Sequence, residues 1–96
     1  MAFLAELMDT YFNDAPQLLA AMRGALADGN AEEFRRAAHS LKSNSASLGA
    51  MTLSALAKEL EMMGRAGVLD GAADKLARVE AEYEQVKVAL EKKRGQ

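Results

Sequence analysis

Apolar residues recur every three or four positions along almost the whole chain. This spacing is typical of amphipathic helices, and no segment shows the alternation expected of a half-buried strand. The pattern therefore predicts an all-α protein. Short polar or glycine-containing connections separate four major helical segments, which favours antiparallel neighbours in an up-down-up-down four-helix bundle.

The first segment contains the single proline of the chain, Pro16. A proline inside a helix removes a hydrogen-bond donor, and Asn13 and Asp14 just before it are good N-cap residues. We therefore predict a short additional N-terminal helix that ends at about Asn13, followed by a helix over about residues 15–27. A single kinked helix through Pro16 is the alternative.

Capping residues set the next boundaries. Asn30, with Glu33 three positions later, has the spacing of a capping box and predicts a helix from Ala31 to about Leu48. Gly49 is predicted to end this helix, because glycine readily adopts the left-handed conformation of a helix terminus.

Two further helices are predicted in the second half of the chain. One begins at Ala50 or Met51 and ends within residues 64–67, which contain two glycines. Asp70 is predicted to cap the last helix. The predicted core positions of these two helices are Leu53, Leu56, Leu60, Met63, Leu76, Val79, Tyr83, Val86 and Leu90.

Length and composition narrow the class of protein. The 96 residues are half hydrophobic, which predicts one domain over residues 1–96 with one core. The absence of cysteine excludes a disulfide scaffold and a thiol nucleophile. A net charge of −2 gives no reason to expect binding to nucleic acid or to a membrane, and no apolar run approaches the roughly 20 residues of a membrane span. A cytoplasmic location is therefore expected.

The chemistry-bearing segment is residues 34–50, which contain the only histidine, His39. The predicted core positions of this helix are Phe34, Ala37, Ala38, Leu41, Ser45 and Leu48. At about 100° per residue, His39 lies roughly 150° from the centre of that face. The histidine is therefore predicted to be exposed.

The neighbours of His39 on its own helix suggest a role. Arg35 and Lys42 lie about one turn away on either side, and cations disfavour the protonated imidazole, which leaves a lone pair free to act as a nucleophile. They would also neutralise a dianionic group once attached. The small side chains of Ser43 and Ala46 leave room for another protein. This arrangement suits a histidine that receives a phosphoryl group from a bulky donor, although a surface histidine without a role is the alternative.

Residues 38–50, AHSLKSNSASLGA, resemble the signature of histidine-containing phosphotransfer (HPt) domains in phosphorelays. The shared features are the histidine, Leu41, Lys42, a run of small and polar residues, and the final Leu-Gly-Ala. Residues 12–19 also resemble the segment that enters the family's second helix. Ser43 is a departure, because the family commonly has glycine four positions after the histidine.

The resemblance implies functions for His39 and Lys42. His39 would accept a phosphoryl group on Nε2 from an aspartyl phosphate of a receiver domain and pass it to another receiver, while Lys42 helps to hold the group. The chain would be a phosphoryl carrier without a nucleotide site rather than an enzyme, and a monomer. It would bind no cofactor itself, with Mg²⁺ expected on the partner. The expected partners are response-regulator receiver domains, a hybrid sensor histidine kinase, or both.

The partner is expected to contact the exposed flank of His39 together with the neighbouring first and second helices. Arg35, Lys42, Ser43 and Ala46 are the predicted contact residues of the histidine helix. Arg36 and Ser47 lie further round the same helix and complete the predicted set.

Two other functions remain open. The dimerisation and phosphoacceptor domain of a sensor histidine kinase also presents a histidine on a bundle helix. Those domains usually follow the histidine directly with an acidic residue and soon after with a proline, whereas Ser40 follows His39 here and no proline comes after it. The second alternative is a helical docking module in which His39 has no role.

Overall fold

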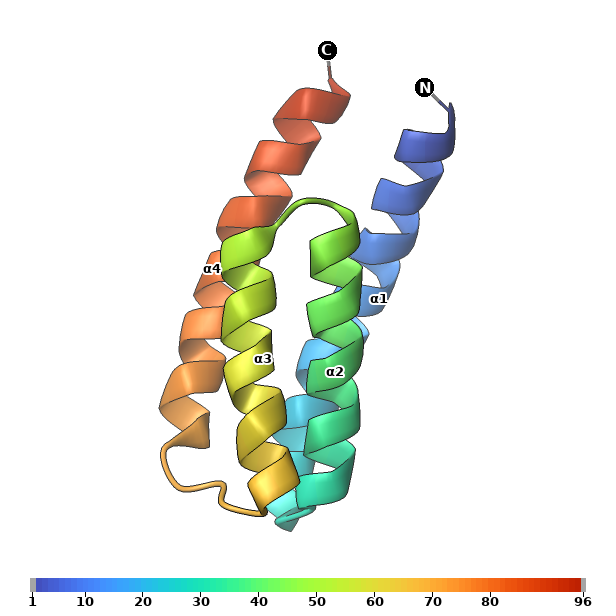
Figure 1. Ribbon diagram of the computed structural model, residues 1–96. Helices are drawn as coiled ribbons and strands as arrows, with labels where there is room; N and C mark the ends of the chain where they lie inside the picture. Colours follow the sequence, from blue (N-terminus) through green and yellow to red (C-terminus); the bar gives the residue numbers. More distant parts are fainter. Residues whose placement is uncertain (1, 96) are drawn as a thin grey trace.

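The computed structural model describes residues 2–95 of the chain. This part forms four α-helices and no strand. The helices are α1 (Ala2–Asp28), α2 (Ala31–Ser47), α3 (Met51–Ala66) and α4 (Ala72–Arg94). Successive helices run in opposite directions (Figure 1). The all-α prediction is confirmed; Met1 and Gln96, the ends of the predicted domain, lie outside the described residues.

The predicted break near Pro16 is wrong, because α1 is one helix that continues through this residue. Pro16 itself is exposed, while Ala15 and Leu19 on either side of it are buried in the core. Burial of both halves of the helix against the same core offsets the missing backbone donor. The side-chain Nε2 of Gln17 also donates to the carbonyl oxygen of Asn13, at 3.0 Å, within the turn that contains the proline.

The boundaries of α2 are confirmed, as is the end of α3. Asn30 caps α2 by accepting a hydrogen bond from the backbone N–H of Glu33 at its side-chain oxygen, at 3.1 Å. Gly49 follows the C-cap of α2 with a φ of 76°, and Gly67 ends α3 with a φ of 73°. Both angles lie in the left-handed region that glycine adopts without steric cost.

The predicted cap of the last helix is wrong. The N-cap of α4 is Gly71, with a φ of 80°, and no side chain caps this end. Asp70 lies one residue too early, because the helix begins at Ala72, which is completely buried. The left-handed glycine provides the tight turn that brings Ala72 into the core.

The core lies along the bundle axis and receives side chains from all four helices. Of the core positions predicted in α3 and α4, most are buried and the other three are half-buried: Leu56, Met63 and Val86. The core also contains one polar pair, in which the hydroxyls of Tyr11 and Ser45 are hydrogen-bonded at 2.9 Å. Among the described residues, no buried side-chain polar atom lacks a hydrogen-bond partner.

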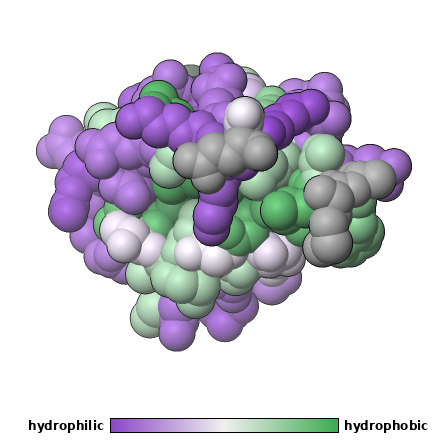
Figure 2. Space-filling model, turned by 90° about the horizontal axis from the view of Figure 1, so that it is seen from above, coloured by the Kyte–Doolittle hydropathy of each residue, from purple (hydrophilic) through white to green (hydrophobic). Residues whose placement is uncertain are grey.

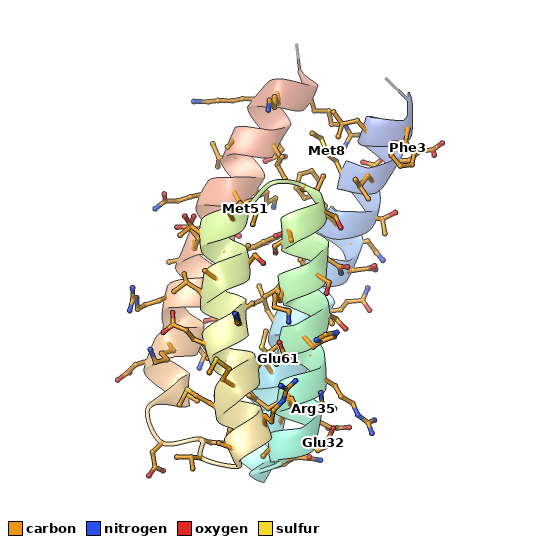
Figure 3. All side chains as sticks on the ribbon, viewed as in Figure 1. Phe3, Met8, Glu32, Arg35, Met51 and Glu61 are labelled. Atoms are coloured by element: carbon orange, nitrogen blue, oxygen red, sulfur yellow. The ribbon has the colours of Figure 1, made fainter. Side chains whose placement is uncertain are left out.

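The packing order leaves one face of α2 uncovered. α2 packs on α1 and on α3, while α4 closes the bundle by packing on α3 and α1 (Figure 1). The outer face of α2 is therefore open to solvent or to a partner. The end of the bundle where α1 begins carries apolar surface among polar side chains (Figure 2). Phe3 and Met51, which are exposed, lie at this end (Figure 3). Within residues 2–95, no helix is both long enough and apolar enough to cross a membrane.

Candidate functional site

His39 lies in the middle of α2, on the face that no other helix covers. Its side chain is 54% exposed, whereas its neighbour Ala38 is completely buried. The predicted exposure of His39 is therefore confirmed. The helix holds the imidazole at the surface of the bundle because the core positions of α2 are turned the other way.

The imidazole is bound by a carboxylate from the neighbouring helix. Nδ1 of His39 lies 2.8 Å from Oε2 of Glu61, which belongs to α3. Glu61 is only 3% exposed, and Figure 3 shows it between α3 and α2. Its other carboxylate oxygen, Oε1, lies 2.7 Å from Nζ of Lys42, and a guanidinium nitrogen of Arg65 lies 3.2 Å from Oε2. One buried carboxylate thus joins the histidine to two cations.

These contacts favour the ionised form of Glu61. The hydrogen bond from Lys42 lowers the pKa of its carboxyl group most strongly; burial opposes this effect, and the hydrogen bond with His39 adds to the lowering. Glu61 is therefore a carboxylate at neutral pH, and a carboxylate can only accept hydrogen bonds. Nδ1 of His39 must then be the donor.

The tautomer that follows leaves Nε2 as the reactive atom. In a neutral imidazole with its proton on Nδ1, Nε2 carries the free lone pair. A carboxylate that holds Nδ1–H also stabilises the positive charge that develops on the ring when Nε2 bonds to an electrophile. The arrangement can therefore present a nucleophilic nitrogen at an exposed surface.

The charged group that contacts His39 differs from the one predicted from the sequence. Cations of the same helix were predicted to be the charges that act on the ring, but the charged group hydrogen-bonded to it is the carboxylate of Glu61. Arg35 forms an ion pair with Glu32 instead, and both residues lie near one end of α2 (Figure 3). Lys42 forms an ion pair with Glu61. The spacing along α2 placed both cations near the ring but carried no information about acidic residues on other elements.

A groove runs beside His39, between α1 and α2. Its volume is about 390 Å³, and it is open to solvent. The residues that line it are Asp14, Gln17 and Leu18 of α1 with His39, Ser40, Ser43 and Asn44 of α2. Another surface could therefore reach the imidazole from the α1 side as well as from above α2.

The predicted contact residues of α2 do not form one uniform surface. Arg36, Ser43, Ala46 and Ser47 are exposed, whereas Lys42 is 28% exposed. Ser43 shares the groove with His39. Ser47 instead donates a hydrogen bond from Oγ to the backbone oxygen of Ser43, at 3.1 Å, and borders a separate small pocket near the start of α1.

Two residues of the site, Glu61 and Arg65, were missed in the sequence. A signal for Glu61 was present: it follows Ala57 by four residues and precedes Gly64 by three, and all three residues are buried. A glutamate at a core spacing between two small residues is a buried charge that needs partners. Arg65 lies four residues after Glu61, the spacing at which side chains on one helix meet.

Within residues 2–95, no group of three or more histidine, cysteine, aspartate or glutamate side chains is placed to hold a metal ion. The charged cluster around His39 contains one carboxylate and two cations, so its charges suit an incoming anion better than a cation.

Two comparisons with known proteins match this chain. A family model described as the Hpt domain matches residues 6–89. Among solved structures, the chain is similar to histidine-containing phosphotransfer protein B (HptB) from Pseudomonas aeruginosa PAO1, with 34% identity and a TM-score of 0.89. That match covers 93% of this chain and 77% of the other. A comparison with curated protein sequences finds no match.

Proposed function

Because the chain belongs to the Hpt family and is a phosphorelay intermediate of two-component signalling, we propose that His39 is the residue that accepts and passes on the phosphoryl group. The observation that carries this proposal is the 2.8 Å contact between Nδ1 of the exposed imidazole and the buried carboxylate of Glu61. His39 is also the only histidine of the chain.

The proposed transfer takes place at Nε2. Its lone pair attacks the phosphorus of an aspartyl phosphate on a receiver domain, in line with the bond to the aspartate oxygen. The N–P bond forms as the O–P bond breaks, and the aspartate leaves as a carboxylate. The proton on Nδ1 stays in its hydrogen bond to Glu61, which stabilises the positive charge of the ring. The aspartate of a second receiver reverses these steps and leaves His39 free.

The surrounding residues have separate roles in this proposal. Glu61 is a positioning residue, because it holds the ring through the nitrogen that does not react. Lys42 is the cation that balances the dianionic phosphoryl group, and its Nζ is already close to the ring through their common partner, Glu61. Arg65 contacts the same carboxylate and is a second cation at the edge of the site.

Proteins of the Hpt family are phosphotransfer carriers that interact with receiver domains and histidine kinases. We propose that this chain has no catalytic machinery beyond the residues around His39 and binds no cofactor, so that Mg²⁺ is supplied by the receiver. We also propose that it acts as a monomeric, antiparallel four-helix bundle in the cytoplasm.

The proposed receiver surface combines the open face of α2 with the groove towards α1. His39 and Ser43 belong to both parts, since they line the groove and are exposed on α2. Arg35, Arg36, Lys42, Ala46 and Ser47 complete the α2 side of the proposed contact. Asp14 and Gln17 add polar groups from α1.

The test is phosphoryl transfer from a labelled, phosphorylated receiver domain to the parent chain and to His39→Gln. Acid-labile, base-stable label on the parent alone is the expected result, with circular dichroism showing equal helix content in both proteins. If neither protein is labelled by a panel of receivers from the same organism, the docking module without a reactive histidine becomes the better account. Sedimentation separates the proposed monomer from a two-chain kinase domain.

A further inference from the structure

Gly64 of α3 lies directly against the backbone of α2. A Cβ added to this buried glycine would be 2.9 Å from the N, Cα and Cβ of Arg35, whereas ordinary contacts of this kind are 3.4–4 Å long. Two of these three atoms are backbone and cannot rotate away. A side chain at position 64 therefore requires α2 and α3 to shift relative to each other, by about half an ångström if an ordinary contact is to be restored.

This close approach is adjacent to the site. Gly64 lies one helical turn after Glu61 on α3, and Arg35 lies one turn before His39 on α2. Because the two helices run in opposite directions (Figure 1), the Gly64–Arg35 contact is next to the Glu61–His39 contact. In Figure 3, Arg35 lies on α2 below the level of Glu61.

A second interhelical contact lies on the other side of the site. The hydroxyl of Ser54 on α3 donates a hydrogen bond to the backbone oxygen of Lys42 on α2, at 2.9 Å. The separation of the helices at Glu61 is thus set from two sides, by a hydrogen bond at Ser54 and by the missing side chain at Gly64.

We propose that Gly64 is a positioning residue for phosphoryl transfer, because its lack of a side chain sets the helix separation at which Glu61 reaches both His39 and Lys42. This inference rests on the proposed function of His39 and deepens it. Glu61 is buried and makes its two shortest contacts, at 2.8 Å and 2.7 Å, to His39 and Lys42, which both belong to α2.

The distances explain the sensitivity of the contact. A separation of about half an ångström lengthens the Nδ1–Oε2 distance from 2.8 Å to beyond the usual 2.7–3.2 Å range of N–H···O hydrogen bonds. The ring would then lose its fixed tautomer and orientation. A misplacement of about 1 Å costs up to roughly a hundredfold in rate, so we expect one of half that size to slow transfer by about tenfold.

The direct test compares Gly64→Ala with Gly24→Ala. Gly24 is the matched control because it is also a helical glycine, is exposed, and has nothing within 4 Å of an added Cβ. Two properties are measured: the rate of labelling by a phosphorylated receiver, and the nitrogen and Nδ1 proton NMR signals of His39. We expect Gly64→Ala to be labelled about tenfold more slowly and to lose the parent's Nδ1–H signal, while Gly24→Ala keeps both properties of the parent.

A folded Gly64→Ala protein with the parent's rate and spectrum would overturn the inference. If the variant does not fold, Glu61→Asp tests the same requirement for the position of the carboxylate. Its side chain is one methylene shorter, so the carboxylate lies further from His39 while Gly64 and the helix separation are unchanged. Transfer to Glu61→Asp at the parent rate would also overturn the inference. If the parent chain itself is not labelled, the proposed function fails, and the NMR comparison alone still decides whether Gly64 positions the ring.

Discussion

Nδ1 of His39 and Oε2 of Glu61 lie 2.8 Å apart, across the interface between α2 and α3. The imidazole is largely exposed, but the carboxylate that holds it is buried and ionised. Nδ1 is thereby held by a buried group, and Nε2 is left free to react at the surface.

Replacing Glu61 by glutamine is expected to slow phosphoryl transfer to His39 by roughly tenfold to hundredfold, as happens when a carboxylate that orients a metal-bound histidine is lost. The amide keeps the shape of the side chain but not its charge, so it neither fixes the proton on Nδ1 nor stabilises the charged ring. Glu59→Gln is the matched control, because Glu59 lies on the same helix in an exposed ion pair with Lys75. Equal rates for the two variants would contradict the role of Glu61.

Stability in acid is expected to depend on the same carboxylate. The pKa of Glu61 is lowered in the folded protein, mainly by the hydrogen bond from Lys42. A carboxyl group with a lowered folded pKa stabilises the fold above its unfolded pKa, and this contribution is lost as the pH falls through the folded value. The free energy of unfolding of the parent is therefore expected to fall below about pH 4.5, the ordinary pKa of a glutamate.

Urea unfolding at pH 7 and at several values below pH 4.5 measures this effect. Glu61→Gln is expected to lose less stability than the parent over this interval. Glu32 and Glu59, whose pKa values are also lowered, are present in both proteins and cancel in the comparison. Equal losses in parent and variant would show that Glu61 is not the group responsible.

Lys42→Ala is expected to slow transfer by at least about tenfold, because a cation at the phosphoryl group stabilises the charge of the transition state. The helix content should not change, since Glu61 keeps its contacts with His39 and Arg65. Lys92→Ala removes the same charge from an exposed position on α4 and serves as the control. If the Lys42→Ala protein is labelled as fast as the control, Lys42 has no role in phosphoryl transfer.

The pair Tyr11–Ser45 is expected to support the fold rather than the chemistry. Both residues are buried, and the hydroxyl of each is the other's hydrogen-bond partner. Ser45→Ala leaves the tyrosine hydroxyl unpaired and is expected to lower the free energy of unfolding by about 1–3 kcal/mol. In urea unfolding, Tyr11→Phe combined with Ser45→Ala should cost less than the sum of the single changes; strict additivity would contradict the pairing.

Periodicity predicted the features that depend on one helix at a time. The exposure of His39, the core positions of α3 and α4, and the cap at Asn30 all follow from local spacing, and the structure has them. The break at Pro16 did not form because burial on both sides of the proline, at Ala15 and Leu19, outweighs its local preference.

Residues contributed by a second helix could not be placed in this way. The spacing along α2 predicts which side of the helix His39 occupies, but not which residue of α3 lies opposite it. Glu61 reaches the ring through the register of two antiparallel helices, and Gly64 contributes to that register through the space it leaves free. Both features depend on distances between helices, which a pattern of apolar positions does not contain.

The measurement that tests the account most directly is NMR of the phosphorylated chain with ¹⁵N-labelled histidine. We expect one phosphohistidine, with the phosphorus coupled to Nε2 of His39 and a proton retained on Nδ1 in its hydrogen bond to Glu61. A phosphoryl group on Nδ1, or on a residue other than His39, would contradict it.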